Sequence, residues 1–463
     1  MSNLSKSKIR IPHPVVLLFG MLCGVAFLSY LIPAGQFQRV MLDGRDVVVP
    51  GTYQTIPATP IGFMDIFLAM PKGFKGAIEI IFIILSSGIM FGFLQKSGAI
   101  EQAVGTLIFK TGRENATKVI VLVTFIYGFL GVFVGYENNI ALVPIAAILS
   151  IALGGDLLLA AGMSVGAITI GFGLSPFNAY TVGTGHKLAG LPMFSGYELR
   201  TVLCLIGLLA LSFVNVKHYK KNKTKNAANL SVIPDDLRLS KPLDSYQINL
   251  KDGLIISLFI GSIILILIGV FRWSWYINEL SAVFCMLAIL LGIVGRYTTH
   301  EIGETVLSSV AVVAPGAFMV GLAGSIRILL EQGNMNDTIA FHLSEMLQTG
   351  SASLSAVIMV LVQSAMNFLI PSGSGQALAT LPVMIPVGEV IGLTRQTTIL
   401  AFQIGDGLTN LVNPSFGGIM AMLSLCRVPF DEWLRFISPL LLVLMLVASL
   451  FVVGSVYLNY GPF

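Results

Sequence analysis

Two acidic residues lie inside strongly apolar stretches of the sequence, where a carboxylate is well suited to bind a cation. Glu137 lies in the segment GYENN (135–139), and Asp406 lies one helical turn before Asn410. An ionisable group at bilayer depth costs about 2.5 to 3.5 kcal/mol even on lenient insertion scales, so something must compensate it. The functional interpretation is a ligand for Na⁺, a proton or a cationic substrate group. The alternative is a structural ion pair or a position at the wet interface.

Neutral donors and acceptors accompany the two acids at four interruptions of the apolar pattern, 135–139, 171–178, 371–376 and 405–415. Such residues often cap freed helix ends, but in a transporter the same positions bind substrate or ions. We expect Na⁺, if it binds, near Glu137, Asn178, Asp406 and Asn413. The neutral candidates are Asn138, Asn139, Ser175, Asn178, Ser372, Ser374, Gln376, Thr409, Asn410, Asn413 and Ser415.

The composition identifies the class of protein that must position these residues. The chain has 463 residues, of which 55% are hydrophobic and 11% charged, against about 25% charged in soluble domains. A polytopic membrane protein is therefore predicted. The four cysteines have no ligand spacing, the net charge of +4 is small, and no nucleotide-binding loop, metal-ligand cluster or nucleophile–base pair is evident. We expect neither an enzyme, nor a bound cofactor, nor a nucleic-acid partner.

The sequence also indicates an internal duplication. Gly135, Pro144, Gly154 and Pro176 recur as Gly373, Pro382, Gly392 and Pro414, each at an offset of 238. Matching pairs of apolar segments interrupted by Gly and Pro in two halves are the best sequence pointer to a transporter binding site. Backbone that cannot close its helical hydrogen bonds at membrane depth must be buried in protein or line a cavity.

The order of predicted elements follows from this duplication. Each half should carry a re-entrant hairpin, at 117–153 and 352–390, followed by a broken transmembrane helix. For the first hairpin, a full span followed by another is the alternative, because its first arm can nearly cross. The other predictions are spans at 14–31, 77–95, 197–214, 253–271, 277–295, 309–330 and 436–457, broken helices at 157–190 and 396–425, interfacial helices at 99–110 and 335–347, and an external loop at 35–60.

Charge distribution suggests the orientation. A Lys-rich segment at 217–225 lies in a predicted cytoplasmic linker, 217–250, between a first repeat (1–216) and a second (251–463). The N-terminus should be cytoplasmic and Phe463 external, which makes the repeats inverted. His186 and Lys187 are candidates for binding a carboxylate. The expected interface anchors are Arg327, Arg395, Trp273 and Trp275.

At these motifs the chain resembles the YfcC family, which belongs with the DcuC and ArcD carriers in the ion transporter superfamily. The similarity rests on GYENNIALVPI, SPFNAYTVG, FLIPSGSGQALATLPVMIP, LTRQTTILAFQIGDGLTNLVNP and IPAGQF. It implies a carrier of the bacterial inner membrane with two inverted repeats and an elevator-type movement. Two positions depart from the family pattern: Asn138 replaces the second acid of GYEEN, and Ser415-Phe416-Gly417 replaces the usual T-S-G.

These observations favour a secondary transporter over a channel, since duplicated broken helices are typical of carriers. The tips and breaks contain no basic residue, so net acidity favours a cationic substrate. We predict uptake or exchange of an amino acid, preferably basic, with coupling to Na⁺ or H⁺. A C4-dicarboxylate carrier is the alternative. A homodimer is expected by analogy with other elevator carriers.

Overall fold

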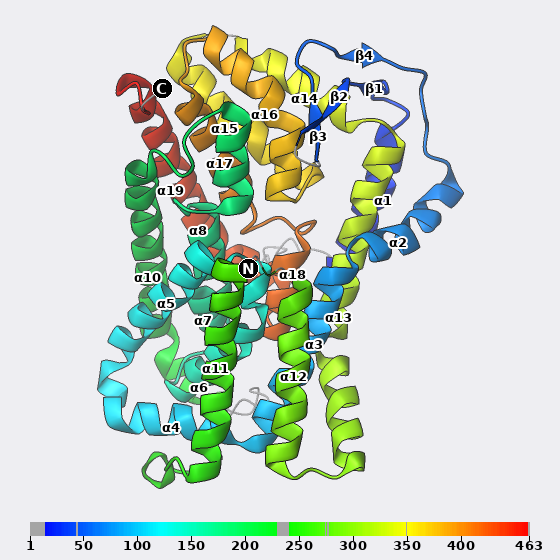
Figure 1. Cartoon of the computed structure of the whole chain (residues 1–463). Coiled ribbons are helices and arrows are strands. Elements are labelled where there is room, and N and C mark those ends of the chain that lie inside the picture. Colours follow the sequence, from blue (N-terminus) through cyan, green and yellow to red (C-terminus); the bar gives the residue numbers. More distant parts are fainter. Residues whose placement is uncertain are drawn as a thin grey trace, which may run out of the picture.

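The computed structural model describes residues 14–42, 45–228, 240–273, 275, 277–348 and 350–461. Helices dominate, and Figure 1 shows their arrangement. Within the described residues, seven helices are long and apolar enough to cross a membrane. The predicted class, a helical multi-pass membrane protein, is therefore confirmed.

Six helices pack against one another and form what we call the wall. They are α1 (Pro14–Leu28), α2 (Phe63–Gly76), α3 (Ile78–Ser97), α11 (Leu250–Trp273), α12 (Ile277–Gly295) and α13 (Thr299–Gln332). Glycine permits close approach of α3 to α13, because a Cβ on Gly88 would lie 2.6 Å from Val313 and one on Gly92 would meet Ser309. Small residues four apart are typical of membrane helices that pack tightly.

The predicted external loop at 35–60 carries two small antiparallel sheets. Strand β1 (Gly35–Gln36) pairs with β4 (Gln54–Thr55), and β2 (Arg39–Leu42) pairs with β3 (Arg45–Val48). An ion pair of 2.7 Å between Arg39 and Asp337 attaches this region to α14 (Asn336–Glu345). The helix α2 that follows has no counterpart among the predicted elements. The sequence does not reveal this helix, because Asp65, Pro71, Lys72 and Lys75 interrupt its apolar pattern.

The second group of helices, which we call the hairpin domain, contains both predicted hairpins and both broken helices. Helix α4 (Ala99–Thr111) leads from the wall into the first hairpin. In Figure 1 the α4 and α6 end of the first hairpin lies at the bottom, whereas the second hairpin enters from the top. The helices of the domain are α5 (Ala116–Val134), α6 (Val143–Ala152), α7 (Leu157–Ala161), α8 (Ala167–Gly173), α9 (Thr184–Ala189), α10 (Tyr197–Ala228), α15 (Ala352–Leu369), α16 (Gly373–Val390), α17 (Arg395–Thr409), α18 (Gly417–Leu425) and α19 (Phe430–Tyr457).

Both broken helices are interrupted within the predicted segments 171–178 and 405–415, but the predicted interruption at Gly405–Gly407 is wrong, because these residues continue helix α17. In the first, α7 continues through a π-helical turn at Gly162–Gly166 into α8, which ends before Pro176. A second π-helical turn, Ala179–Gly183, leads into α9. In the second, α17 ends at Thr409 and α18 begins at Gly417. Each break therefore lies between two helical segments. Its residues, rich in Gly, Pro and Asn, do not continue the helix.

Glycines let the two broken helices cross at close range. A Cβ built on Gly407 would lie 2.3 Å from the Gly173 Cα, so neither position has room for a side chain. Each broken helix also packs closely on its own hairpin. A Cβ on Gly171 would meet the Gly128 carbonyl oxygen of α5, and one on Gly405 would lie 2.6 Å from the Val360 carbonyl oxygen of α15. The four elements consequently converge on one region.

Element boundaries repeat at the same offset of 238 as the glycines and prolines. Helices α6 and α16 end at Ala152 and Val390, and α7 and α17 begin 238 residues apart. Gly154 and Gly392 both have φ of +84°, in the left-handed region that favours glycine. Asp156 and Thr394 each cap the helix that follows through a side-chain oxygen. The two halves thus share local geometry as well as sequence pattern.

Several predicted boundaries differ from the structure. Helix α10 continues to Ala228, well past the expected end at 214, because its Lys and Ala residues favour helix beyond the apolar span. Helix α13 begins at Thr299, where a capping box with Glu301 starts it, ten residues before the predicted span. The N-terminal residues 1–13, part of the linker (229–239) and Phe463 lie outside the described residues, so orientation and domain division remain predictions.

Candidate functional site

A cavity of about 400 Å³ lies where the two hairpin tips, the second break and the wall meet. Five of the thirteen predicted site residues line it: Glu137, Ser372, Ser374, Asn410 and Ser415. Phe172, the second-last residue of α8, also lines the cavity, so the first break borders it too. The remaining lining residues are Gly73, Gly76, Ala77, Ile80, Tyr180, Ile277, Val320, Ala323, Gly324, Arg327, Ile328, Ile370, Pro371, Gly373, Phe416, Gly417 and Gly418. The cavity is large enough for a small metabolite, since ligand pockets measure about 300 to 1,000 Å³.

The tip of the first hairpin is held between the two breaks by Tyr136. This side chain is fully buried, and its hydroxyl lies 3.1 Å from the Thr169 hydroxyl of α8. Its ring lies 5.6 Å from that of Phe172 and 4.6 Å from that of Phe416, between centroids. Sequence reasoning missed Tyr136, although an aromatic residue beside an acid in a glycine-initiated turn was a usable signal. The tip therefore ends at the level of the breaks, as a re-entrant hairpin requires.

Glu137 is placed at the start of a short 3₁₀ helix, Glu137–Leu142, and lines the cavity half-buried. The free N–H groups at a helix start favour negative charge there. Asn139, by contrast, faces inward, and its amide donates hydrogen bonds to the carbonyl oxygens of Gly135 and Leu130. Asn139 is therefore a cap of the tip. The side chain of Asn138 lies outside what the structure describes.

The second break is fastened to its hairpin by Asn367 of α15, which the sequence analysis did not select. The Asn367 amide lies 2.8 Å from each of three acceptors, the Asp406 carbonyl, the Thr409 hydroxyl and the Asn410 amide oxygen. The backbone oxygen of Asn367 accepts a hydrogen bond from Asn413. Thr409 and Asn413 thus hold the break in place and do not line the cavity.

Ser415 also stabilises the second break. Its hydroxyl lies 2.9 Å from the Phe368 carbonyl oxygen and 2.6 Å from the Asn413 amide oxygen. At the first break, the Ser175 hydroxyl donates to the Val132 carbonyl, and the Asn178 amide oxygen accepts from the Tyr180 backbone N–H. These polar side chains close backbone hydrogen bonds that the breaks leave open. The capping interpretation therefore accounts for Ser175 and Asn178, which do not line the cavity.

Asp406 is fully buried in the last turn of α17 and does not line the cavity. Among the described residues neither carboxylate oxygen has a hydrogen-bond partner. A Cβ on Gly373, the first residue of α16, would lie 3.5 Å from Asp406 Oδ2 and 2.6 Å from Thr181 Cγ2. The Thr181 hydroxyl is likewise buried and has no partner in the described part of the chain.

Two further amide oxygens in this region are also unpaired. Gln376 donates through Nε2 to the carbonyl and side-chain oxygens of Gln363, at 2.8 Å each, while its own Oε1 has no partner within the described residues. The same holds for Asn367 Oδ1. Unpaired buried oxygens in this region therefore outnumber unpaired amide donors, of which Gln363 Nε2 is one within the described residues. A proton or a small cation would satisfy such a set of oxygens.

The basic residues are distributed differently from the expectation. Arg327 was predicted to be an interface anchor, yet it lines the cavity from α13. His186 is buried, and neither it nor Lys187 lines the cavity. Arg200 was not selected from the sequence, although it is fully buried and donates to the side-chain oxygens of Gln396 and Gln403.

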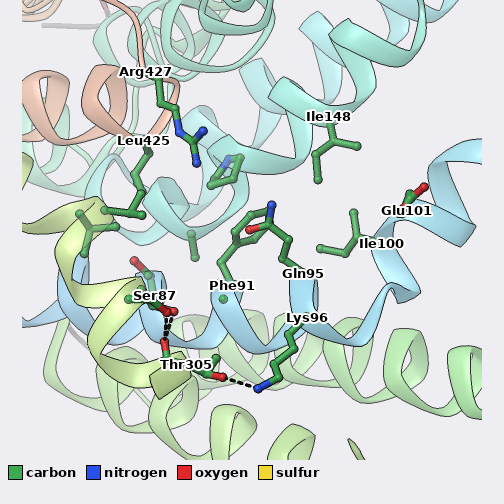
Figure 2. Close-up of a pocket in the computed structure, with 18 of the residues that line it drawn as sticks. Ser87, Phe91, Gln95, Lys96, Ile100, Glu101, Ile148, Thr305, Leu425 and Arg427 are labelled. Atoms are coloured by element: carbon green, nitrogen blue, oxygen red, sulfur yellow. Dashed lines mark hydrogen bonds between the residues drawn. The ribbon is translucent and has the colours of Figure 1, made fainter. Parts of the chain in front are cut away.

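A second cavity of about 950 Å³ lies between α3, α13, α4, α6 and the end of α18. Figure 2 shows Gln95, Lys96 and Arg427 among its polar lining, with Lys96 donating to the Thr305 hydroxyl. Glu101 and Ser240, at the end of the linker, also line it. This larger cavity lies on the linker side of the molecule, so we call it the linker-side vestibule.

Comparison with known proteins agrees with these features. The family DcuC, described as C4-dicarboxylate anaerobic carrier, matches residues 11–457. A relative from Escherichia coli (strain K12), named "Putative basic amino acid antiporter YfcC", is 28% identical over 510 aligned positions, which cover 99% of this chain and 100% of the relative. The two names differ in the substrate they state.

Two solved transporters align with nearly the whole chain at low identity. MtrF of Neisseria gonorrhoeae, described within a class of antimetabolite efflux pumps, aligns over 98% of both chains with 17% identity and a TM-score of 0.44. The YdaH transporter of Alcanivorax borkumensis aligns over 97% of this chain and 100% of its own, with 14% identity and a TM-score of 0.45. Because the family match spans nearly the whole chain, this protein belongs to the DcuC family and, within it, groups with YfcC as a membrane transporter and not an enzyme.

Proposed function

We propose that this chain is a secondary active transporter of the bacterial inner membrane that takes up or exchanges a small amino acid, preferably a basic one. The observation that carries the proposal is the position of Glu137, whose carboxylate enters a cavity built by both hairpin tips and the second break. A cationic group of the substrate would pair with this carboxylate. The name of the E. coli relative, which includes a basic amino acid, is consistent with that choice.

The proposed movement is an elevator, in which the hairpin domain carries the substrate past the wall. Its support is the repeated geometry at an offset of 238 and the entry of the two hairpins from opposite ends of the molecule (Figure 1). These features are those of an inverted repeat. The wall contacts the hairpin domain through small residues, with Gly417 of α18 close to Val320 of α13. Such a contact has few side chains that must separate during movement.

We assign the coupling ion to Asp406. A buried carboxylate with no hydrogen-bond donor is costly while it is charged, so it should hold a proton or a cation such as Na⁺. Thr181 and Asn367 have unpaired neutral oxygens and lie near it. If the Lys-rich linker is cytoplasmic, the linker-side vestibule is the cytoplasmic entrance to the site. The homodimeric state remains a prediction.

A C4-dicarboxylate carrier is the second candidate. The family description and the presence of Arg327 in the cavity favour it, because guanidinium groups bind carboxylates well. A dicarboxylate with two negative charges would, however, place one of them near Glu137. The zwitterion of an amino acid fits one acid and one base better.

Counterflow in proteoliposomes tests the proposal. Liposomes loaded with unlabelled arginine, ornithine or lysine should accumulate labelled arginine transiently, which a channel cannot do. Parallel liposomes loaded with succinate should not. Succinate counterflow without any response to the three basic amino acids would contradict the proposal and favour the dicarboxylate carrier.

A further inference from the structure

The cavity between the hairpin tips has a simple charge pattern. Among the described residues that line it, Glu137 and Arg327 alone carry a formal charge. Glu137 comes from the first hairpin tip in the hairpin domain, and Arg327 comes from α13 in the wall. One acid and one base thus enter the same cavity from different bodies of the molecule.

Arg327 has most of its donors available. Its Nε donates to Glu331 Oε1 at 2.7 Å, one helical turn further along α13. Within the described residues, its two terminal nitrogens have no hydrogen-bond partner. Because a guanidinium carries five N–H donors, four remain for another group. A planar carboxylate can accept two parallel hydrogen bonds from that edge.

The wall fixes the backbone that carries Arg327, whose side chain is largely exposed. A Cβ on Gly73 of α2 would lie 2.4 Å from the backbone nitrogen of Ser325, and one on Gly324 would lie 2.7 Å from the Gly73 carbonyl oxygen. The helices α2 and α13 are therefore in backbone contact within one turn of Arg327. A rigid backbone at this point fixes the direction from which the guanidinium reaches the cavity.

We infer that Arg327 recognises the α-carboxylate of the substrate while Glu137 pairs with its cationic group, so that the cavity selects a zwitterionic amino acid over the corresponding decarboxylated amine. The inference rests on the proposed function and makes it more specific. The two tips and two breaks contain no basic residue, so the wall supplies the basic group for recognition. Arg327 is thereby a specificity-determining residue.

The amine agmatine, which is arginine without its carboxylate, is the probe that isolates this contact. Purified wild-type protein should be stabilised against thermal unfolding by arginine at concentrations on the order of ten- to hundredfold lower than by agmatine, since a hydrogen bond to a charged group contributes about 1.5 to 3 kcal/mol. Arg327→Gln should weaken arginine binding to the level of agmatine and leave agmatine binding unchanged. Lysine and cadaverine form an independent second pair.

Two control variants separate recognition from a structural effect. Glu331→Gln removes the ion pair and keeps the guanidinium, so it should preserve the preference for arginine. Arg395→Gln removes an arginine of similar exposure that does not line the cavity, and it should also have no effect. An Arg327→Gln variant that binds arginine and agmatine in the wild-type ratio would overturn the inference and leave the proposed function intact. A wild-type protein that no amino acid stabilises against thermal unfolding would contradict both the inference and the proposed function.

Discussion

Glu137 and Asp406 look alike in the sequence, since each is an acid beside a glycine-rich break, but the structure places them in different surroundings. Glu137 lines an open cavity and begins a 3₁₀ helix, whereas Asp406 is sealed inside α17 without a hydrogen-bond donor among the described residues. A group that exchanges with a dissolved substrate must be reachable, and one that stores a proton or a small ion can be enclosed. The difference suggests that substrate binding and ion coupling use separate carboxylates.

The largest effect is expected from Glu137→Gln. Loss of the charge should weaken arginine binding about 10- to 100-fold, because a charge-assisted hydrogen bond contributes about 1.5 to 3 kcal/mol. Stability of the ligand-free protein should hardly change, since the side chain faces a cavity. Thermal-shift titration with arginine measures both quantities. As a control, Glu389→Gln removes an exposed acid that pairs with Arg395 outside the cavity. Equal affinity in wild type and Glu137→Gln would remove Glu137 from the binding site.

Asp406→Asn should separate binding from coupling. The substitution keeps the shape of the side chain and removes the group that carries the ion. Affinity for arginine should stay within about twofold, and counterflow should continue, but accumulation driven by a Na⁺ or pH gradient should disappear. Uptake into proteoliposomes with and without each gradient gives the measurement. If accumulation persists at the wild-type level, the coupling ion binds elsewhere.

The two breaks can be compared through their asparagine caps. The two N–H groups of the Asn367 side chain are shared among three acceptors at the second break, and those of Asn139 donate two hydrogen bonds at the first tip. With about 0.6 kcal/mol for each hydrogen bond in a membrane protein, Asn367→Ala should cost about 2 kcal/mol and Asn139→Ala about 1 kcal/mol. Thermal unfolding in detergent would rank them. An equal or reversed order would show that the network around Asn367 does not govern the stability of the second break.

A third acid, Glu101 of helix α4, has several hydrogen-bond donors on one carboxylate oxygen and gives the smallest expected effect. It accepts hydrogen bonds from Tyr246 and from the backbone and hydroxyl of Ser240. Partial burial acts to raise the pKa of Glu101, but the hydrogen bonds from Tyr246 and Ser240 outweigh it, so the pKa lies below its ordinary value of 4.5. A depressed pKa means that the contact is stable above pH 4.5 and is lost as the pH falls through the lowered pKa.

A spin label at Lys241 would report this contact. Its mobility should be low at pH 7 and rise only below pH 4.5, while in Tyr246→Phe the transition should move to higher pH. Ser245, which donates to the Pro242 carbonyl and does not contact Glu101, offers a control in Ser245→Ala. Mobility that changes with pH in the same way in Tyr246→Phe and in the wild type would contradict the assigned hydrogen bond.

The sequence predicts the hairpins and breaks well because their cause is local. Gly and Pro interrupt these helices where they cluster with polar residues, whereas a single proline such as Pro315 lies inside the continuous helix α13. Gly154 and Gly392, which are 238 residues apart, have the same left-handed φ. The sequence does not predict which polar residues bind and which cap. Ser175 and Asn178 carry the same side-chain types as the residues of the cavity, and only their orientation shows that they close backbone hydrogen bonds.

Asn367, which the sequence analysis missed, and Arg327, which it named only as an interface anchor, lie on elements other than the breaks. Asn367 is in the arm of a hairpin, and Arg327 is in a wall helix, about 80 residues before the second break. Their partners are chosen by helix packing, which local sequence pattern does not encode. For the same reason the argument from net acidity of the tips and breaks was incomplete: the cavity also includes Arg327, so its charge is balanced.

A cryo-electron microscopy structure with arginine bound tests the central claim most directly, namely that the substrate lies between the two hairpin tips. The account predicts ligand density in the cavity lined by Glu137, Ser372 and Ser374, with the cationic group of arginine against the Glu137 carboxylate. Density confined to the linker-side vestibule, or arginine bound with no contact to either tip, would contradict it.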